Sequence, residues 1–95
     1  TVWILEEIGR DKPITVGLVV KESKIEQLNV LIFRESRGWE VKYPFFTDQF
    51  KQSTLGLDNQ LDRNIDGISG ATLSVNALTK LARLALYLDS RVKNK

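Results

Sequence analysis

The chain lacks three residue types that carry much of the redox and hydrolytic chemistry of proteins, since it has no histidine, no cysteine and no methionine. The absence of histidine and cysteine excludes serine–histidine and cysteine–histidine nucleophilic sites, thiol redox centres, and the usual zinc and iron–sulfur sites. Without methionine as well, tyrosine is the remaining common side chain for ligating a haem iron. Any redox chemistry in this chain must therefore reside on an organic cofactor.

Long apolar runs and excess charge are also missing. No apolar stretch approaches the ~18 residues that are needed to cross a bilayer. The net charge is +2, and the basic residues are not interleaved with aromatic ones, so we expect no nucleic-acid partner. Residues 1–95 are long enough for one domain with a modest core. Because the sequence starts without methionine, we expect a domain excised from a longer protein, a mature product, or the remainder after removal of an expression tag.

Three segments in the first third of the chain have the composition of β-strands. Residues 2–8 form a short candidate, and residues 14–21 alternate, with Val16, Leu18 and Val20 on one face. Residues 25–35 are apolar on both faces from Val30 onward, which predicts a central strand that is covered on both sides. The two longer segments are close enough in sequence to pair as an antiparallel hairpin.

The last segment has the periodicity of an amphipathic helix, which we expect over residues 75–92 with Ser74 as the N-cap. Between the strands and this helix, we expect a brief extended piece at 39–43 and a single helical turn at 45–50. Residues 52–64 are predicted to form a loop with one short strand. These elements predict an α+β domain: a small antiparallel sheet packed against a long C-terminal helix.

One short run precedes this helix and contains small and hydroxylated residues: Asp66-Gly67-Ile68-Ser69-Gly70-Ala71-Thr72-Leu73-Ser74. Glycine permits tight turns, and unpaired backbone N–H groups at the start of a helix favour a bound phosphate. A simple capped loop accounts equally well for the composition. The run matches neither the Walker nor the dinucleotide-binding pattern.

Residues 66–74 resemble the attachment site of the FMN-binding domain family, the type found in the sodium-pumping NADH:quinone oxidoreductase and in the Rnf complex. A second similarity lies in Glu35-Ser36-Arg37-Gly38, where the family often has Glu-Thr followed by glycines. A third lies in Phe46-Thr47-Asp48-Gln49-Phe50, where the family has an aromatic-Gln-Phe segment. The resemblance spans residues 14–88.

This resemblance implies that Thr72 carries FMN through a phosphoester bond. A threonine hydroxyl alone is a poor nucleophile, so a flavin transferase would move FMN from FAD to Thr72 and recognise Asp66, Ser69, Gly70 and Ala71. In the family this modification occurs outside the cytoplasm, on periplasmic or otherwise exposed domains of membrane-associated complexes. The flavin then exchanges electrons with quinones, haems or other flavins.

Further residues are expected near the flavin. Ser74 offers a hydroxyl, Glu35 is the last residue of a predicted strand, and Ser36 follows it. Trp39, where the family has a small residue, either stacks on the flavin ring or packs in the core, and Tyr43 is a second aromatic candidate.

Three hypotheses follow for function. The first is an electron-transfer domain with covalent FMN on Thr72, acting as a carrier rather than as a self-contained enzyme. The second is a flavin-delivering module of a larger reductase. The third is a non-redox sensor or interaction domain that binds flavin or phosphate reversibly, or binds nothing.

Overall fold

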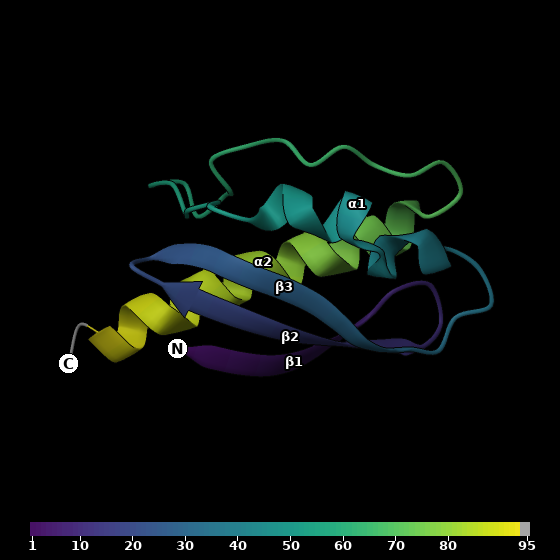
Figure 1. Cartoon of the computed structure of the whole chain (residues 1–95), viewed down its shortest axis with the longest axis horizontal. Coiled ribbons are helices and arrows are strands. Elements are labelled where there is room, and N and C mark those ends of the chain that lie inside the picture. Colours follow the sequence, from purple (N-terminus) through teal and green to yellow (C-terminus); the bar gives the residue numbers. More distant parts are fainter. Residues whose placement is uncertain (94–95) are drawn as a thin grey trace.

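The computed structural model describes residues 1–93 and places them in two main layers (Figure 1). One layer is an antiparallel sheet of β1 (Val2–Ile8), β2 (Pro13–Lys21) and β3 (Lys24–Phe33), in the order β1-β2-β3. The other is the helix α2 (Thr72–Lys93), which lies along one face of the sheet and contacts all three strands. The predicted α+β fold, including the hairpin of the two longer strands, is confirmed.

The core lies between the sheet and α2. The alternation predicted for the second strand holds, because Val16, Leu18 and Val20 are all buried against the helix side. The helix contributes a buried stripe at the expected spacing: Val75, Leu78, Leu81, Ala82 and Ala85.

The third strand is an edge strand, so its prediction as the central strand is wrong. The centre is β2, because β1 pairs along one side of it and β3 along the other. Leu31 and Ile32 are exposed on the face of the sheet opposite α2. Apolar residues on both faces therefore did not signal burial on both faces here.

A β-bulge changes the side-chain pattern of β3. Thr15 pairs with Ile32 while the next residue, Val16, pairs with Val30, which leaves Leu31 as the extra residue. As a result Val30 and Phe33 both pack against the core. Simple alternation predicts these two residues on opposite faces.

The segment after β3 folds into three short helical turns: η1 (Trp39–Lys42), α1 (Pro44–Thr47) and η2 (Asp48–Phe50). The helical turn expected at 45–50 is present, but the extended piece expected at 39–43 is wrong. Gly38 adopts a left-handed conformation (φ 81°), and its carbonyl accepts a hydrogen bond from the Val41 N–H, which starts a 3₁₀ turn. This turn buries Val41 completely.

Residues 51–71 form a long connection, as expected for 52–64. The short strand predicted within 52–64 is not formed there: Leu55 and Leu61 make only an isolated bridge. The side-chain amide of Gln49 fixes the end of this connection by bonding both backbone polar groups of Asp66. Gln49 Nε2 donates to the Asp66 carbonyl at 3.1 Å, and the Asp66 N–H donates to Gln49 Oε1 at 2.7 Å.

The long helix begins earlier than predicted. Its first residue is Thr72, so Ser74 is the third residue of the helix and its prediction as N-cap is wrong. The cause is a turn in which the Ala71 N–H donates to the Ile68 carbonyl at 2.9 Å, and the Ala71 carbonyl then accepts from the Val75 N–H at 2.9 Å. No helix within residues 1–93 is long and apolar enough to cross a membrane.

Candidate functional site

The start of α2 lies at one end of the molecule, beside the β1–β2 turn and the segment that leaves β3 (Figure 1). The first N–H groups of a helix have no acceptor inside the helix. Within residues 1–93, no backbone carbonyl accepts a hydrogen bond from the N–H of Thr72, Leu73 or Ser74. These amides and the positive end of the helix dipole favour an anionic group here.

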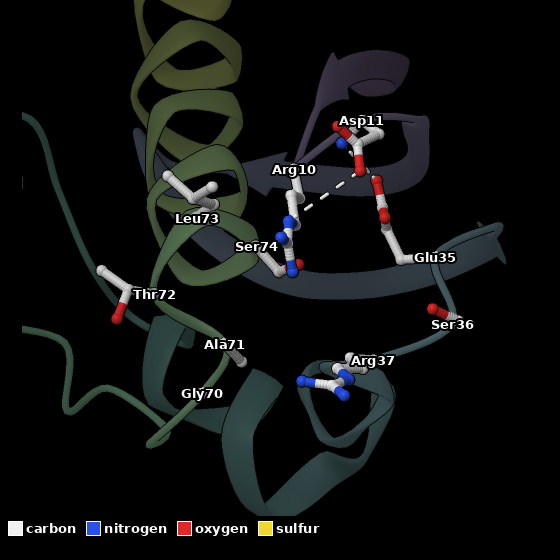
Figure 2. A pocket seen from close by; sticks show the side chains of 10 residues that line it. All are labelled: Arg10, Asp11, Glu35, Ser36, Arg37, Gly70, Ala71, Thr72, Leu73 and Ser74. Carbon is white, nitrogen blue, oxygen red and sulfur yellow. Dashed lines mark hydrogen bonds and ion pairs between the residues drawn. The ribbon is translucent and has the colours of Figure 1, made fainter.

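A cavity of about 690 Å³ opens at this helix start. Its volume falls within the range of about 300–1,000 Å³ that is typical of small-molecule and cofactor sites. Three separate parts of the chain line it: Arg10 and Asp11; Glu35, Ser36 and Arg37; and Gly70, Ala71, Thr72, Leu73 and Ser74 (Figure 2). The fold therefore joins residues that are distant in sequence at the run singled out before α2.

Two glycines allow these parts to approach one another closely. A Cβ on Gly9 would lie 3.2 Å from Ser74 Oγ, and a Cβ on Gly38 would lie 3.4 Å from the same oxygen and 3.2 Å from the Ala71 Cβ. Gly38 also has a positive φ, which residues other than glycine rarely adopt. The small residues at 9, 38 and 71 thus set the close packing around Ser74.

Thr72 is exposed at the first position of α2, on the rim of the cavity. In Figure 2 its side chain projects to the left, away from Arg10 and Arg37. Nothing within residues 1–93 hydrogen-bonds to its hydroxyl, so the oxygen is accessible to an external enzyme.

Glu35 lies at the cavity, but one of its oxygens is committed to the fold. Its Oε1 accepts from the backbone N–H of Asp11 at 2.7 Å and from that of Lys12 at 2.5 Å. The hydrogen bond from the Asp11 N–H, followed by that from Lys12, lowers the pKa of the Glu35 carboxyl below its ordinary value. Glu35 is therefore an anion that stabilises the β1–β2 turn.

The structure brings six of the nine predicted site residues together at the cavity: Thr72, Gly70, Ala71, Ser74, Glu35 and Ser36. The other three, Asp66, Ser69 and Trp39, do not line it. Asp66 and Ser69 are exposed on the connection that leads to α2, where an outside enzyme has access to them.

Trp39 is not a core residue, since 47% of its surface is exposed. Its ring instead makes an edge contact with Tyr43, with centroids 5.4 Å apart, and Tyr43 lies 6.5 Å from the Phe45 ring. All three aromatic side chains are exposed outside the cavity. Packing of Trp39 in the core, one of the two alternatives for this residue, is therefore excluded.

Sequence reasoning missed the two arginines of the cavity, Arg10 and Arg37. Arg10 follows β1 and Arg37 follows β3, and the two lie near each other only because the strands end at the same side of the molecule. A signal was present in the sequence, since each arginine is adjacent to a glycine in a predicted turn, Gly9 or Gly38. Gly-Arg pairs alone are too common to have singled them out.

A comparison with protein-family models identifies the chain. The model of the FMN-binding domain matches residues 9–87, which is most of the sequence. The chain belongs to the FMN-binding domain family. No curated protein and no solved structure gives a significant match. The match contains every residue of the cavity and all of the run from Asp66 to Ser74, so FMN is the cofactor to test against this site.

The residues of the cavity fit a flavin nucleotide in three respects. The volume is sufficient, the helix start suits a phosphate, and Gly70 is open enough that a Cβ there would contact nothing within 4 Å. An approach of the ligand over Gly70 is therefore unobstructed.

Proposed function

We propose that this domain is an electron carrier whose FMN is attached covalently to Thr72 by a phosphoester bond. FMN, when bound, accepts and releases electrons, and the protein holds it and sets its surroundings. The observation that supports the proposal is the position of Thr72: it is an exposed hydroxyl at the first residue of α2, at the rim of a cavity inside the family match.

We expect attachment to require an outside enzyme, because no basic side chain within residues 1–93 hydrogen-bonds to the Thr72 hydroxyl. Histidine and cysteine are missing, and the carboxylates of the cavity, Asp11 and Glu35, lie on the other side of the helix start in Figure 2. In the proposed transfer, Thr72 Oγ1 forms a bond to the flavin-side phosphorus of FAD. The phosphoanhydride bond breaks, AMP leaves with the bridging oxygen, and the hydroxyl proton passes to a base of the transferase.

The rest of the sequence run has a supporting role in this proposal. Asp66 and Ser69 present an exposed recognition segment, which the bonds from Gln49 to the Asp66 backbone hold in place. Gly70 leaves space for the ribityl chain, the small side chain of Ala71 lines the cavity beside it, and Ser36 and Ser74 offer hydroxyls there.

The partners and location proposed for the chain follow the same reasoning. A flavin transferase would mature the domain, and quinone, haem or flavin proteins would exchange electrons with it. We place it outside the cytoplasm, in a membrane-associated protein or complex. If this domain is fused to a reductase, the same flavin would deliver electrons to that active site.

Mass spectrometry tests the covalent link. When the chain is co-expressed with a flavin transferase, its intact mass should increase by one FMN group, and the modified peptide should contain Thr72. Thr72→Val should remain unmodified. Thr79→Val is the matched control, because Thr79 lies within α2 and its hydroxyl is already bonded to the Val75 carbonyl at 2.9 Å. An unmodified wild-type chain, or a modified Thr72→Val chain, would contradict the proposal.

A further inference from the structure

Two guanidinium groups and one hydroxyl converge on the side of the helix start away from the Thr72 side chain. We propose that Arg10, Arg37 and Ser74 form a binding site for a phosphate-type oxyanion, together with the free amides of the first turn of α2. This site does not depend on the covalent link to Thr72. An anionic group would bind there at a position separate from the Thr72 oxygen.

Ser74 is the first observation that supports the site. Its residue surface is only 4% exposed, and its hydroxyl makes no hydrogen bond within residues 1–93. Every fully buried side-chain nitrogen or oxygen in the described chain has a partner, so the Ser74 oxygen must keep its small exposure toward the cavity that it lines. A nearly buried hydroxyl without a partner costs free energy, which a ligand oxygen would recover by accepting its proton.

The arginines are the second observation. Arg37 has no ion pair within residues 1–93, and Arg10 has only a long contact of 3.9 Å from its Nε to Asp11 Oδ2, between two exposed side chains. In Figure 2 the Arg10 guanidinium points down past Ser74 and the Arg37 guanidinium turns toward Ala71, so both border the same space. Two like charges that share a space favour an anion between them, and guanidinium groups suit phosphate oxygens.

Two carboxylates also line the cavity, so the balance of charge must be considered. Asp11 and Glu35 lie together at the upper right of Figure 2, apart from Arg37. The Glu35 Oε1 is engaged by the Asp11 and Lys12 amides. Arg10 lies between the two groups, since its Nε is 3.9 Å from Asp11 Oδ2, whereas Arg37 lies apart from both carboxylates (Figure 2). The positive end of α2 adds to the positive charge near Arg37.

Helix geometry separates this site from the Thr72 oxygen. Residues two positions apart on an α-helix point to nearly opposite sides, since each residue turns by about 100°. Figure 2 shows Thr72 and Ser74 in this relation, with Arg10 and Arg37 on the Ser74 side. The oxyanion bound by the arginines has two sources to distinguish: the phosphate of a flavin nucleotide bound without a covalent link, and free inorganic phosphate.

The test uses the unmodified chain, labelled with ¹⁵N and titrated with inorganic phosphate. We expect saturable shifts of the Leu73 and Ser74 amides and of the Nε signals of Arg10 and Arg37. Arg37→Gln and Arg10→Gln should each weaken binding about tenfold, as expected for the loss of one charge-assisted contact. Arg91→Gln removes the same charge from an exposed position at the far end of α2, and should change the affinity less than twofold.

The outcomes separate the site from general electrostatics. Absence of saturable shifts would overturn the proposal, as would an Arg91→Gln effect equal to that of Arg37→Gln. Displacement of phosphate by FMN but not by riboflavin would support the site and identify a flavin nucleotide as its ligand. Binding of phosphate without displacement by FMN would support a site for the free ion. Neither result depends on the mass gain at Thr72, so the two proposals can fail independently.

Discussion

The carboxylate of Glu35 joins two distant parts of the chain. It follows β3, and it accepts hydrogen bonds from two amides of the turn between β1 and β2. Arg10 lies in this turn, and Arg37 lies two residues after Glu35. The Glu35 carboxylate therefore helps to fix the position of Arg10 relative to Arg37.

Low pH should weaken the hydrogen bonds that the Glu35 carboxylate accepts from the turn. The pKa of Glu35 is lower in the folded chain than in the unfolded one, because the Asp11 and Lys12 amides stabilise its charge. Its contribution to stability is therefore complete above the ordinary glutamate pKa, and it is lost as the pH falls through the lowered value. An NMR titration of side-chain carboxyl carbons should show Glu35 titrating below the ordinary glutamate range. Glu35→Gln should reduce the loss of stability in that acidic window. A Glu35 signal that titrates at or above the ordinary range would contradict this assignment.

Sequence reasoning also has a limit at the scale of single residues. The run from Gly70 to Ser74 is recognisable because its composition is local and matches a family motif. Arg10 and Arg37 are not, because side chains so far apart in sequence line one cavity only once the sheet has formed. Local composition predicts Ser74 as the helix cap, but the turn at Ala71 starts the helix earlier and turns Ser74 inward.

At the scale of elements, residues 39–50, which form η1, α1 and η2, contain two sets of aromatic side chains. One set is buried and the other is exposed. Phe46 and Phe50 are buried and make an edge contact, with centroids 5.7 Å apart. Trp39, Tyr43 and Phe45 face solvent. The segment thus extends the core on one side, while Gln49 holds the approach to the site through Asp66.

A matched pair of phenylalanines should demonstrate this division. Phe50 is 0% exposed and Phe45 is 68% exposed, although both lie in the same helical segment. Phe50→Ala should lower the free energy of unfolding by about 3–5 kcal/mol, because it leaves a cavity in the core. Phe45→Ala should change it by about 0.5 kcal/mol or less. Urea denaturation measures both, with Phe50→Leu as a milder variant if Phe50→Ala does not fold. Similar losses for the two alanine variants would be inconsistent with the burial described.

Elements were predicted well where a periodic pattern was long. The alternation of β2 and the stripe of α2 extend over several repeats, so their faces followed directly from the sequence. The pattern of β3 failed at the bulge, because an extra residue at Leu31 shifts the register without a local sign in the sequence. The segment at 39–43 failed because the left-handed Gly38 starts a turn where local composition suggested extended chain.

At the scale of the whole molecule, Asp89 connects the start of β1 with the last turns of α2. Its side chain is 1% exposed, its Oδ1 accepts from the Thr1 hydroxyl at 2.6 Å, and its Oδ2 lies 3.2 Å from Lys93 Nζ. Burial raises the pKa of Asp89, but the Thr1 hydroxyl and the Lys93 ammonium outweigh this and hold the pKa below its ordinary value. The carboxylate is therefore charged at neutral pH, and its hydrogen bond with Thr1 connects α2 to the start of the sheet.

Loss of the Asp89 carboxylate should lower the free energy of unfolding. Asp89→Ala leaves the Thr1 hydroxyl without its acceptor, and we expect a loss of about 1–3 kcal/mol in the free energy of unfolding. Asp48→Ala is the control: the exposed Asp48 pairs with Lys51 at 3.2 Å, and an exposed pair contributes about 0–1 kcal/mol. Thermal and urea denaturation measure both. A loss at Asp89 no larger than that at Asp48 would show that the Asp89 carboxylate does not stabilise the fold.

The two layers also fix where the cavity lies relative to the ends of the described chain. Thr1 and Lys93 both lie near Asp89, and the cavity lies at the opposite end of a molecule that is 41 Å long (Figure 1). A bead or electrode attached at Thr1 or Lys93 would therefore leave the cavity directed into solution, where a large molecule that diffuses freely can reach it.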